Sequence, residues 1–250
     1  MKREKKLYQS VVFGVFVLAL SSAVNAQGTT NQDEWDFTVT PFGWMTGLHG
    51  NARVGNMPSS VDVKFGDVLE SLRMAAMLDL RAQKGRWGVQ SNIIWLEMNE
   101  ADDTQGVHIE AKPKMWFVDL DGFYQITDQW SVLAGIRYFD TTISVKGSGA
   151  LNFYEKIDEN WVDPIMGTEF KTPLSERWSM GARGDIGGFG VGSDLSWQIW
   201  AGAEWRFAKK NALAFGWRHL AWDYANGSGA DRLEMDTYMT GPYVGVELHF

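Results

Sequence analysis

The chain has 250 residues, of which 45% are hydrophobic, 14% aromatic and 22% charged, and this apolar content excludes a disordered protein. Its formal net charge of −8 at pH 7 argues against a nucleic-acid-binding protein, because such proteins present a basic surface to phosphate. The absence of Cys excludes a disulfide-stapled scaffold, a thiolate zinc site and a cysteine nucleophile.

The first 26 residues have the pattern of a secretory signal peptide. A basic segment precedes an apolar run over 11–20, and the small residues Val24, Asn25 and Ala26 follow as a cleavage pattern. The apolar run is shorter than the roughly 20 residues that a helix needs to span a bilayer. We therefore expect a signal peptide over 1–26, a short periplasmic segment over 27–34 and one barrel domain over 35–250.

After this leader, apolar and polar residues alternate in many segments, which is the period-two pattern of β-strands. In the last segment, for example, Val244, Val246 and Leu248 share one face, while Gly245 and Glu247 share the other. The alternation predicts an all-β protein of ten strands, with eight as the alternative count. The predicted strands are 35–47, 72–83, 87–98, 108–126, 130–146, 159–172, 177–189, 195–207, 212–224 and 233–250.

The linkers between these strands alternate in length. Short polar linkers follow every second strand, and longer linkers follow the others, over 48–71, 99–107, 147–158, 190–194 and 225–232. Aromatic residues gather beside the short linkers, as in the girdles of membrane barrels. The sequence thus predicts a closed antiparallel transmembrane β-barrel rather than a soluble sandwich. Whether 48–71 forms an extra hairpin is open, and alternation over 61–65 favours one.

Four prolines fall inside the predicted strands, where each removes a donor from the hydrogen-bond ladder. They are Pro41, Pro113, Pro164 and Pro242. We expect bulges near the rim or at the closing seam to accommodate them.

The final strand has a face made of Val244, Val246, Leu248 and Phe250. This face resembles the C-terminal signature that bacterial outer-membrane proteins present to their barrel-assembly machinery. Five further segments resemble a widespread family of uncharacterised Gram-negative outer-membrane β-barrels. The segments are 35–42, 84–88, 161–164, 183–193 and 241–242. The resemblance implies an outer-membrane location and a fold similar to OmpA-type and small porin-like barrels, with no established activity to transfer.

Charged residues of both signs fall on the face predicted to line the barrel. Because side chains nearly fill a small barrel and buried charges need partners, we expect a closed, salt-bridged lumen. The alternative is a narrow porin-like channel in which Arg137, Arg183 and Arg218 form a track for small anions. The predicted lumen network consists of Asp79, Arg81, Asp119, Asp121, Arg137, Glu169, Arg183, Asp185, Glu204, Arg206, Arg218 and Glu247.

A lipid-modifying outer-membrane enzyme is the second alternative. It would need a nucleophile and a base near the membrane rim, and His219 lies within plausible reach of Ser193 or Ser228 along the predicted strands. No G-x-S-x-G motif accompanies them. We therefore expect no catalytic residue.

Neither a cofactor nor a metal site is expected. The acidic residues over 97–103 lack the EF-hand spacing, and the glycine-rich segment 187–192 is not followed by the helix that a phosphate-binding loop requires. We interpret the former as a solvated loop and the latter as a tight outer loop. The expected partners are outer-membrane lipids, lipopolysaccharide and the barrel-assembly machinery, with no nucleic acid, and the chain is expected to be a monomer.

Overall fold

A computed structural model describes residues 34–250 except 55–56, 105–106, 150–151 and 230–231. The predicted signal peptide over 1–26 lies outside the described residues. No helix in the described ranges has the length and apolarity to cross a membrane. The elements are β1 Asp36–Trp44, β2 Gly47–Val54, β3 Met57–Val63, α2 Phe65–Ser71, β4 Leu72–Lys84, β5 Trp87–Met98, β6 Glu100–Thr104, β7 Val107–Gln125, β8 Trp130–Gly149, β9 Phe153–Pro173, β10 Trp178–Gly188, β11 Leu195–Arg206, β12 Asn211–Asn226 and β13 Leu233–His249.

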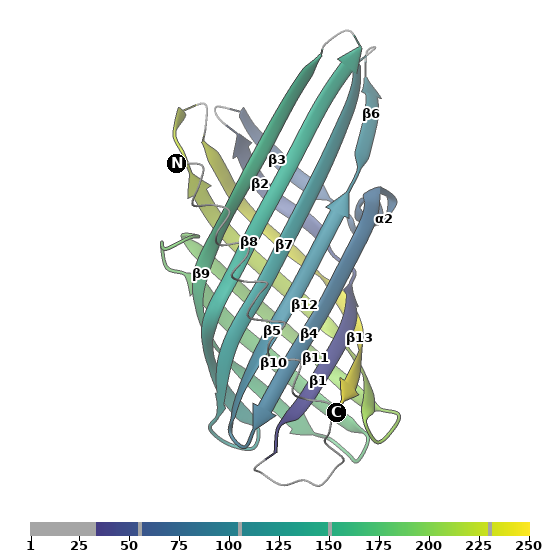
Figure 1. The fold of residues 1–250 in the computed structure, drawn as a ribbon, viewed down its shortest axis with the longest axis vertical. Helices are drawn as coiled ribbons and strands as arrows, with labels where there is room; N and C mark the ends of the chain where they lie inside the picture. Colours follow the sequence, from purple (N-terminus) through teal and green to yellow (C-terminus); the bar gives the residue numbers. More distant parts are fainter. Residues whose placement is uncertain (1–33, 55–56, 105–106, 150–151, 230–231) are drawn as a thin grey trace.

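Ten strands form a closed antiparallel barrel (Figure 1). They pair in the order β1, β4, β5, β7, β8, β9, β10, β11, β12 and β13, and β13 returns to β1 with Val39 opposite Leu248. The predicted ten-stranded barrel is therefore confirmed over the eight-stranded alternative. The two ends of the barrel differ, since tight turns join the strands at one end, here named the short-turn end, and tall strands rise at the other.

The outer surface of the wall is apolar around its middle. Leu120, Ile136 and Met166 lie on it with large exposed fractions, although they are hydrophobic. Near the short-turn end, aromatic side chains pack in pairs, for instance Trp87 on Tyr124 with ring centroids 4.5 Å apart. An apolar band bordered by aromatic residues is the exterior that a bilayer requires of a β-barrel.

Towards the opposite end, four rings on neighbouring strands form a row on the outer surface. His49 on β2 packs on Tyr238 on β13, which stacks on His219 on β12, which stacks on Trp197 on β11, with centroid separations of 5.4, 5.3 and 4.6 Å. We name these four residues the ring row. Amphipathic rings of this kind prefer a membrane–water boundary, so the ring row marks the second border of the apolar band.

Three of the segments predicted as outer loops contain regular structure. The open question about 48–71 is answered by the β2–β3 hairpin, followed by α2. The prediction of loops over 99–107 and 147–158 was wrong, because β6 pairs with β7 and the β8–β9 ladder continues upward as far as Gly147 opposite Phe153. As a result β7, β8 and β9 rise well above the rest of the barrel (Figure 1).

Each proline inside a strand lies where the ladder is interrupted on one side. Pro41 is in the last pair between β1 and β4, and Pro164 lies just beyond the last pair between β9 and β10. Pro113 falls between the parts of β7 that pair with β6 and with β5, and Pro242 falls between the parts of β13 that pair with β2 and with β1. Because one side needs no donor there, the strands accommodate proline.

Candidate functional site

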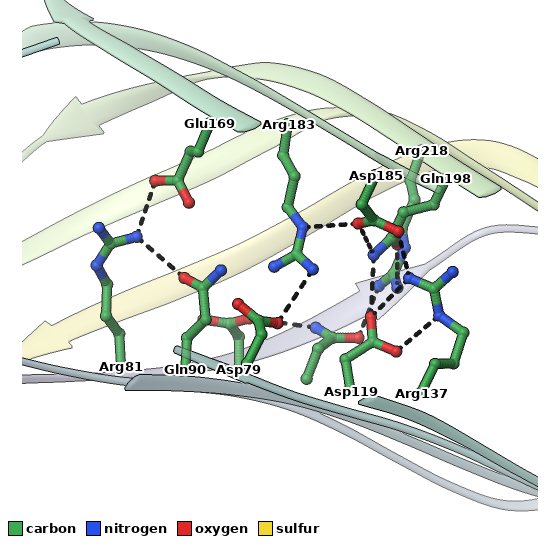
Figure 2. A network of polar contacts seen from close by, with 12 residues as sticks. Asp79, Arg81, Gln90, Asp119, Arg137, Glu169, Arg183, Asp185, Gln198 and Arg218 are labelled. Carbon is green, nitrogen blue, oxygen red and sulfur yellow. Dashed lines mark hydrogen bonds and ion pairs between the residues drawn. The ribbon is translucent and has the colours of Figure 1, made fainter. Parts of the chain in front are cut away.

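The lumen is the candidate site, because inward-facing side chains from almost every barrel strand meet there. Its middle is occupied by a layer of charged and amide side chains, here named the charge layer (Figure 2). The members of the charge layer are Asp79, Arg81, Gln90, Asn92, Asp119, Asp121, Arg137, Glu169, Arg183, Asp185, Gln198 and Arg218. They come from eight strands, β4, β5 and β7 to β12.

Arg137 lies at the centre of the charge layer and has no exposed surface. Its Nε donates to Asp119 Oδ1 at 2.7 Å, and its Nη2 donates to Asp119 Oδ2 at 3.0 Å and to Asp185 Oδ1 at 2.8 Å. Two guanidinium nitrogens contact the Asp119 carboxylate, and one of these nitrogens also contacts Asp185. These contacts hold the guanidinium in a fixed orientation. These contacts tie β7, β8 and β10 together across the lumen.

Arg183 and Gln198 extend this cluster. Arg183 Nε donates to Asp185 Oδ2 at 2.9 Å and its Nη2 to Asp121 Oδ2 at 3.1 Å. The Gln198 amide nitrogen donates to both Asp119 at 2.9 Å and Asp185 at 2.7 Å, so it adds a neutral donor between two carboxylates. Most buried polar atoms here have partners, as buried charges require.

The remaining members connect the cluster to the opposite wall. Arg218 donates to Gln198 Oε1 at 2.9 Å and to Asn92 Oδ1 at 2.8 Å, and the Asn92 amide donates to Asp79 at 3.3 Å. Separately, Arg81 Nη1 donates to Glu169 Oε1 at 2.8 Å and to Gln90 Oε1 at 3.1 Å. Positive and negative side chains thus alternate across the lumen, and Asp185 lies between Arg137 and Arg183.

Nine of the twelve residues predicted for the lumen network lie in the charge layer, and three lie elsewhere. Glu204 pairs with Lys171 at 2.7 Å near the short-turn end, and Glu247 lies 3.4 Å from His249 Nε2. Arg206 is exposed and donates to the Glu176 backbone oxygen at 3.5 Å, so it does not join the network. Sequence alternation shows which face of a strand a residue occupies. It does not show at what height along the barrel axis the residue lies, so it could not separate these three residues from the charge layer.

Three amide side chains of the charge layer were not predicted from the sequence, because their lack of charge gives no sign that they need buried partners. Asn92 and Gln198 each bridge charged members of the layer, and Gln90 accepts a hydrogen bond from Arg81. The alternation itself could have found them, since Gln198 shares a strand face with Glu204 and Asn92 shares one with Gln90.

An apolar layer lies in the lumen directly above the charge layer, on the side away from the short-turn end. Phe139, which has no exposed surface, contacts Phe117, Trp161 and Trp222 with ring centroids 4.8 to 5.5 Å apart. Trp44 completes the contact between the layers, because the Arg218 guanidinium lies 4.9 Å from its ring centroid. The charge layer is therefore covered by aromatic side chains on the side away from the short-turn end.

The turn between β10 and β11 folds into the top of the lumen. The Ser193 backbone N–H donates to Asp163 Oδ1 at 2.6 Å, and Trp161 Nε1 donates to Ser193 Oγ at 2.8 Å. A Cβ on Gly192 would lie 2.6 Å from that same Asp163 oxygen, so the turn requires glycine there. The glycine-rich segment is therefore a tight turn anchored to the barrel interior.

The structure does not support a pairing of Ser193 with His219. Ser193 is fully buried on the lumen side, whereas His219 belongs to the ring row on the outer surface. The wall separates the two side chains, so the Ser193–His219 pairing considered from the sequence is wrong. Within the described ranges, no group of three or more His, Asp or Glu is arranged to hold a metal ion.

Below the charge layer, a polar cavity of about 150 Å³ extends towards the short-turn end. Arg81, Arg183 and Arg218 line its inner part, while Lys171 and Glu204 line its outer part. The lumen is thus polar at one end and apolar at the other, and the charge layer lies between them.

No protein-family model matches the chain, and no curated protein matches it. Among solved structures, the chain is similar to the outer-membrane protease OmpT of Escherichia coli, with 8% identity, a TM-score of 0.47 and coverage of 90% of this chain and 99% of that one. It is also similar to the attachment invasion locus protein Ail of Yersinia pestis (8%, 0.40, 87% and 99%) and to the translocator domain of the autotransporter NalP of Neisseria meningitidis (12%, 0.38, 98% and 98%). Similarities this low assign neither a family nor an activity.

Proposed function

We propose that the chain is a Gram-negative outer-membrane β-barrel of the structural or surface-interaction type, exported by a signal peptide cleaved after Ala26. The apolar outer band between two aromatic borders supports the membrane location. The lumen serves stability rather than transport. The observation that carries this proposal is the double closure of the lumen by the charge layer around Arg137 and the apolar layer around Phe139.

The tall part of β7, β8 and β9 is the proposed interaction surface. It extends beyond the rest of the wall (Figure 1), and it carries exposed groups such as Tyr154, which is 62% exposed, and the charged residues Lys112, Lys156 and Asp158. A protein that conducts nothing acts through what it presents outside the membrane. Lipopolysaccharide and the assembly machinery are the proposed partners, and a monomer is the proposed form.

Planar-bilayer conductance of the refolded protein tests the closed lumen, after heat-modifiable gel mobility has shown that the barrel is folded. We expect no conductance steps. Discrete, salt-dependent steps would contradict the proposal and support the narrow channel, which the polar cavity of about 150 Å³ favours.

A pair of double variants identifies the conducting path if steps are seen. Arg137→Ala with Arg183→Ala removes two charges from the charge layer, and Lys171→Ala with Arg206→Ala removes two near the short-turn end. In a channel, the first variant changes the step size more than the second, because Lys171 lies at the outer part of the cavity. In a closed barrel, the wild type and the second variant are both silent.

A further inference from the structure

The barrel wall has a gap on one side. β1 and β4 pair only as far as Pro41 and Leu78, and above this level β4 pairs with β5 alone among the described strands. The chain from β1 continues into β2, whose hairpin partner β3 forms no described ladder with β4. Instead α2 connects β3 to β4 beside the gap (Figure 1). The Trp44 backbone N–H faces the Met77 sulfur at 3.3 Å instead of a ladder oxygen.

A cavity of about 310 Å³ lies at this gap, and we name it the side cavity. Its inner part is lined by Trp44, Leu96 and Met115, which belong to the same buried hydrophobic cluster as Phe139. Met45 and Val244, which are 37% and 42% exposed on the outer surface, line it too. Because it touches both faces of the wall, the side cavity connects the apolar layer with the lipid-facing exterior.

The chemistry of the side cavity fits a hydrocarbon. No charged side chain is among its lining residues, and five methionines contribute, namely Met45, Met77, Met98, Met115 and Met239. Methionine is flexible and polarizable and adapts to irregular apolar ligands. The volume is about twice the ~150 Å³ of an engineered apolar cavity that binds benzene, and it reaches the lower end of the range for ligand pockets.

The depth of the side cavity places its opening inside the bilayer. Met45 is level with Pro242, whose oxygen accepts its backbone N–H at 2.9 Å. His49 lies four residues after Met45, and Tyr238 lies four residues before Pro242 on β13, which is roughly 13 Å of extended chain. The opening is therefore on the hydrocarbon side of the ring row, in the half of the membrane that faces outward in the proposed orientation.

We propose that the side cavity binds one acyl chain of an outer-leaflet lipid, which enters sideways through the gap between β3 and β4. This inference rests on the membrane placement proposed above. Phe65, Val68 and Leu69 of α2 cover the opening with apolar side chains, and the headgroup of the bound lipid remains at the level of the ring row. Water has few polar partners in such a cavity, because the Thr46 hydroxyl already donates to backbone oxygens.

Photocrosslinking tests the proposal with the full barrel in vesicles that contain a phosphatidylcholine with a diazirine in its acyl chain. Labelled residues are identified by mass spectrometry. We expect label on the lumen-side residues Met77, Met98 and Met115, in addition to label on the outward Leu120 and Ile136. Label confined to outward residues would overturn the side cavity as a lipid site. If neither the lumen-side nor the outward residues were labelled, the membrane placement would be overturned, and with it the sideways route.

A matched pair of variants on neighbouring residues separates the cavity from the surface. Ala75 lines the side cavity, while Ala76 faces outward on the same strand. Ala75→Trp fills the cavity and is expected to lower lumen-side label about tenfold by steric exclusion, whereas Ala76→Trp leaves it unchanged. Equal lumen-side label in both variants would contradict the proposal.

A second arm distinguishes the source of the chain. A photoreactive free fatty acid is added to vesicles of unlabelled phosphatidylcholine, and the same peptides are analysed. Lumen-side label from the phosphatidylcholine supports the lipid chain as the occupant. Lumen-side label from the free fatty acid alone would overturn it.

Discussion

Arg137 shows how a guanidinium is accommodated in the centre of this barrel. Two carboxylates face it, and Gln198 donates to both, so each charge has neighbours of opposite sign or of suitable hydrogen-bonding character. The free energy of such a group depends on all of its partners, because an unpaired charge in a dry interior is strongly unfavourable.

Replacing Arg137 by Met is therefore expected to destabilise the folded barrel by about 3–5 kcal/mol, the usual effect of removing one member of a buried ion pair. The side chain keeps its bulk, but Asp119 loses the arginine that pairs with it, and Asp185 keeps only Arg183. Urea unfolding in lipid vesicles, followed by gel mobility without boiling, measures the change.

Lys171→Met is the control for that substitution. Lys171 also pairs with a carboxylate, Glu204, but its side chain is 47% exposed and its charge is screened by water. We expect a loss below about 1 kcal/mol. Equal losses for the two variants would show that Arg137 gains nothing special from its burial.

At the scale of elements, the tall part of β7, β8 and β9 is separate from the core of the barrel. The charge layer and the apolar layer lie lower in the wall, so the upper ladders contribute little to closure. Replacing 146–154 with Asn-Gly would join Val145 to Glu155, which are already paired, through a two-residue turn. We expect an unchanged unfolding midpoint and unchanged heat-modifiable mobility.

The same replacement in the next hairpin gives the contrast. Substituting 188–195 with Asn-Gly joins the paired residues Gly187 and Ser196, but it removes Ser193 and its contacts with Asp163 and Trp161. This shortened turn is expected to lower stability measurably. If the upper part of β8 and β9 proved equally sensitive, it would belong to the folding core.

The barrel strands were predictable from the sequence because a bilayer imposes strict alternation on them. β5 has the predicted bounds, and β11 differs at one end by a single residue. The alternation ends outside the membrane, where both faces meet water, so β6 and the upper parts of β8 and β9 gave no apolar signal. The gap beside α2 was equally hidden, because pairing partners depend on register and not on the pattern of one strand.

At the scale of the whole molecule, closure depends on the seam between β1 and β13. The chain has no Cys, so every thiol or disulfide measured in a double-cysteine variant comes from the two introduced cysteines. Val39 and Leu248 are directly opposite each other across the seam, which brings their Cα atoms within about 5.5 Å, a distance suited to a disulfide. Val39→Cys with Leu248→Cys is expected to form a disulfide in the refolded barrel after mild oxidation, measured by loss of maleimide-reactive thiols.

Val39→Cys with Phe215→Cys is the matched control, because Phe215 belongs to β12 and β13 separates it from β1. This pair is expected to keep both thiols free. A disulfide in the control but not in the seam variant would contradict the closure order of the strands.

The seam strands contribute no charged side chain to the layer of ion pairs, which draws only on the eight strands between them. Trp44 of β1 contacts Arg218, but through its ring. The ion pairs of the charge layer can consequently form while the sheet is curved but still open. The edge strands β1 and β13 can then pair last. The pairing of β1 with β13, which closes the barrel, therefore neither makes nor breaks an ion pair of the charge layer.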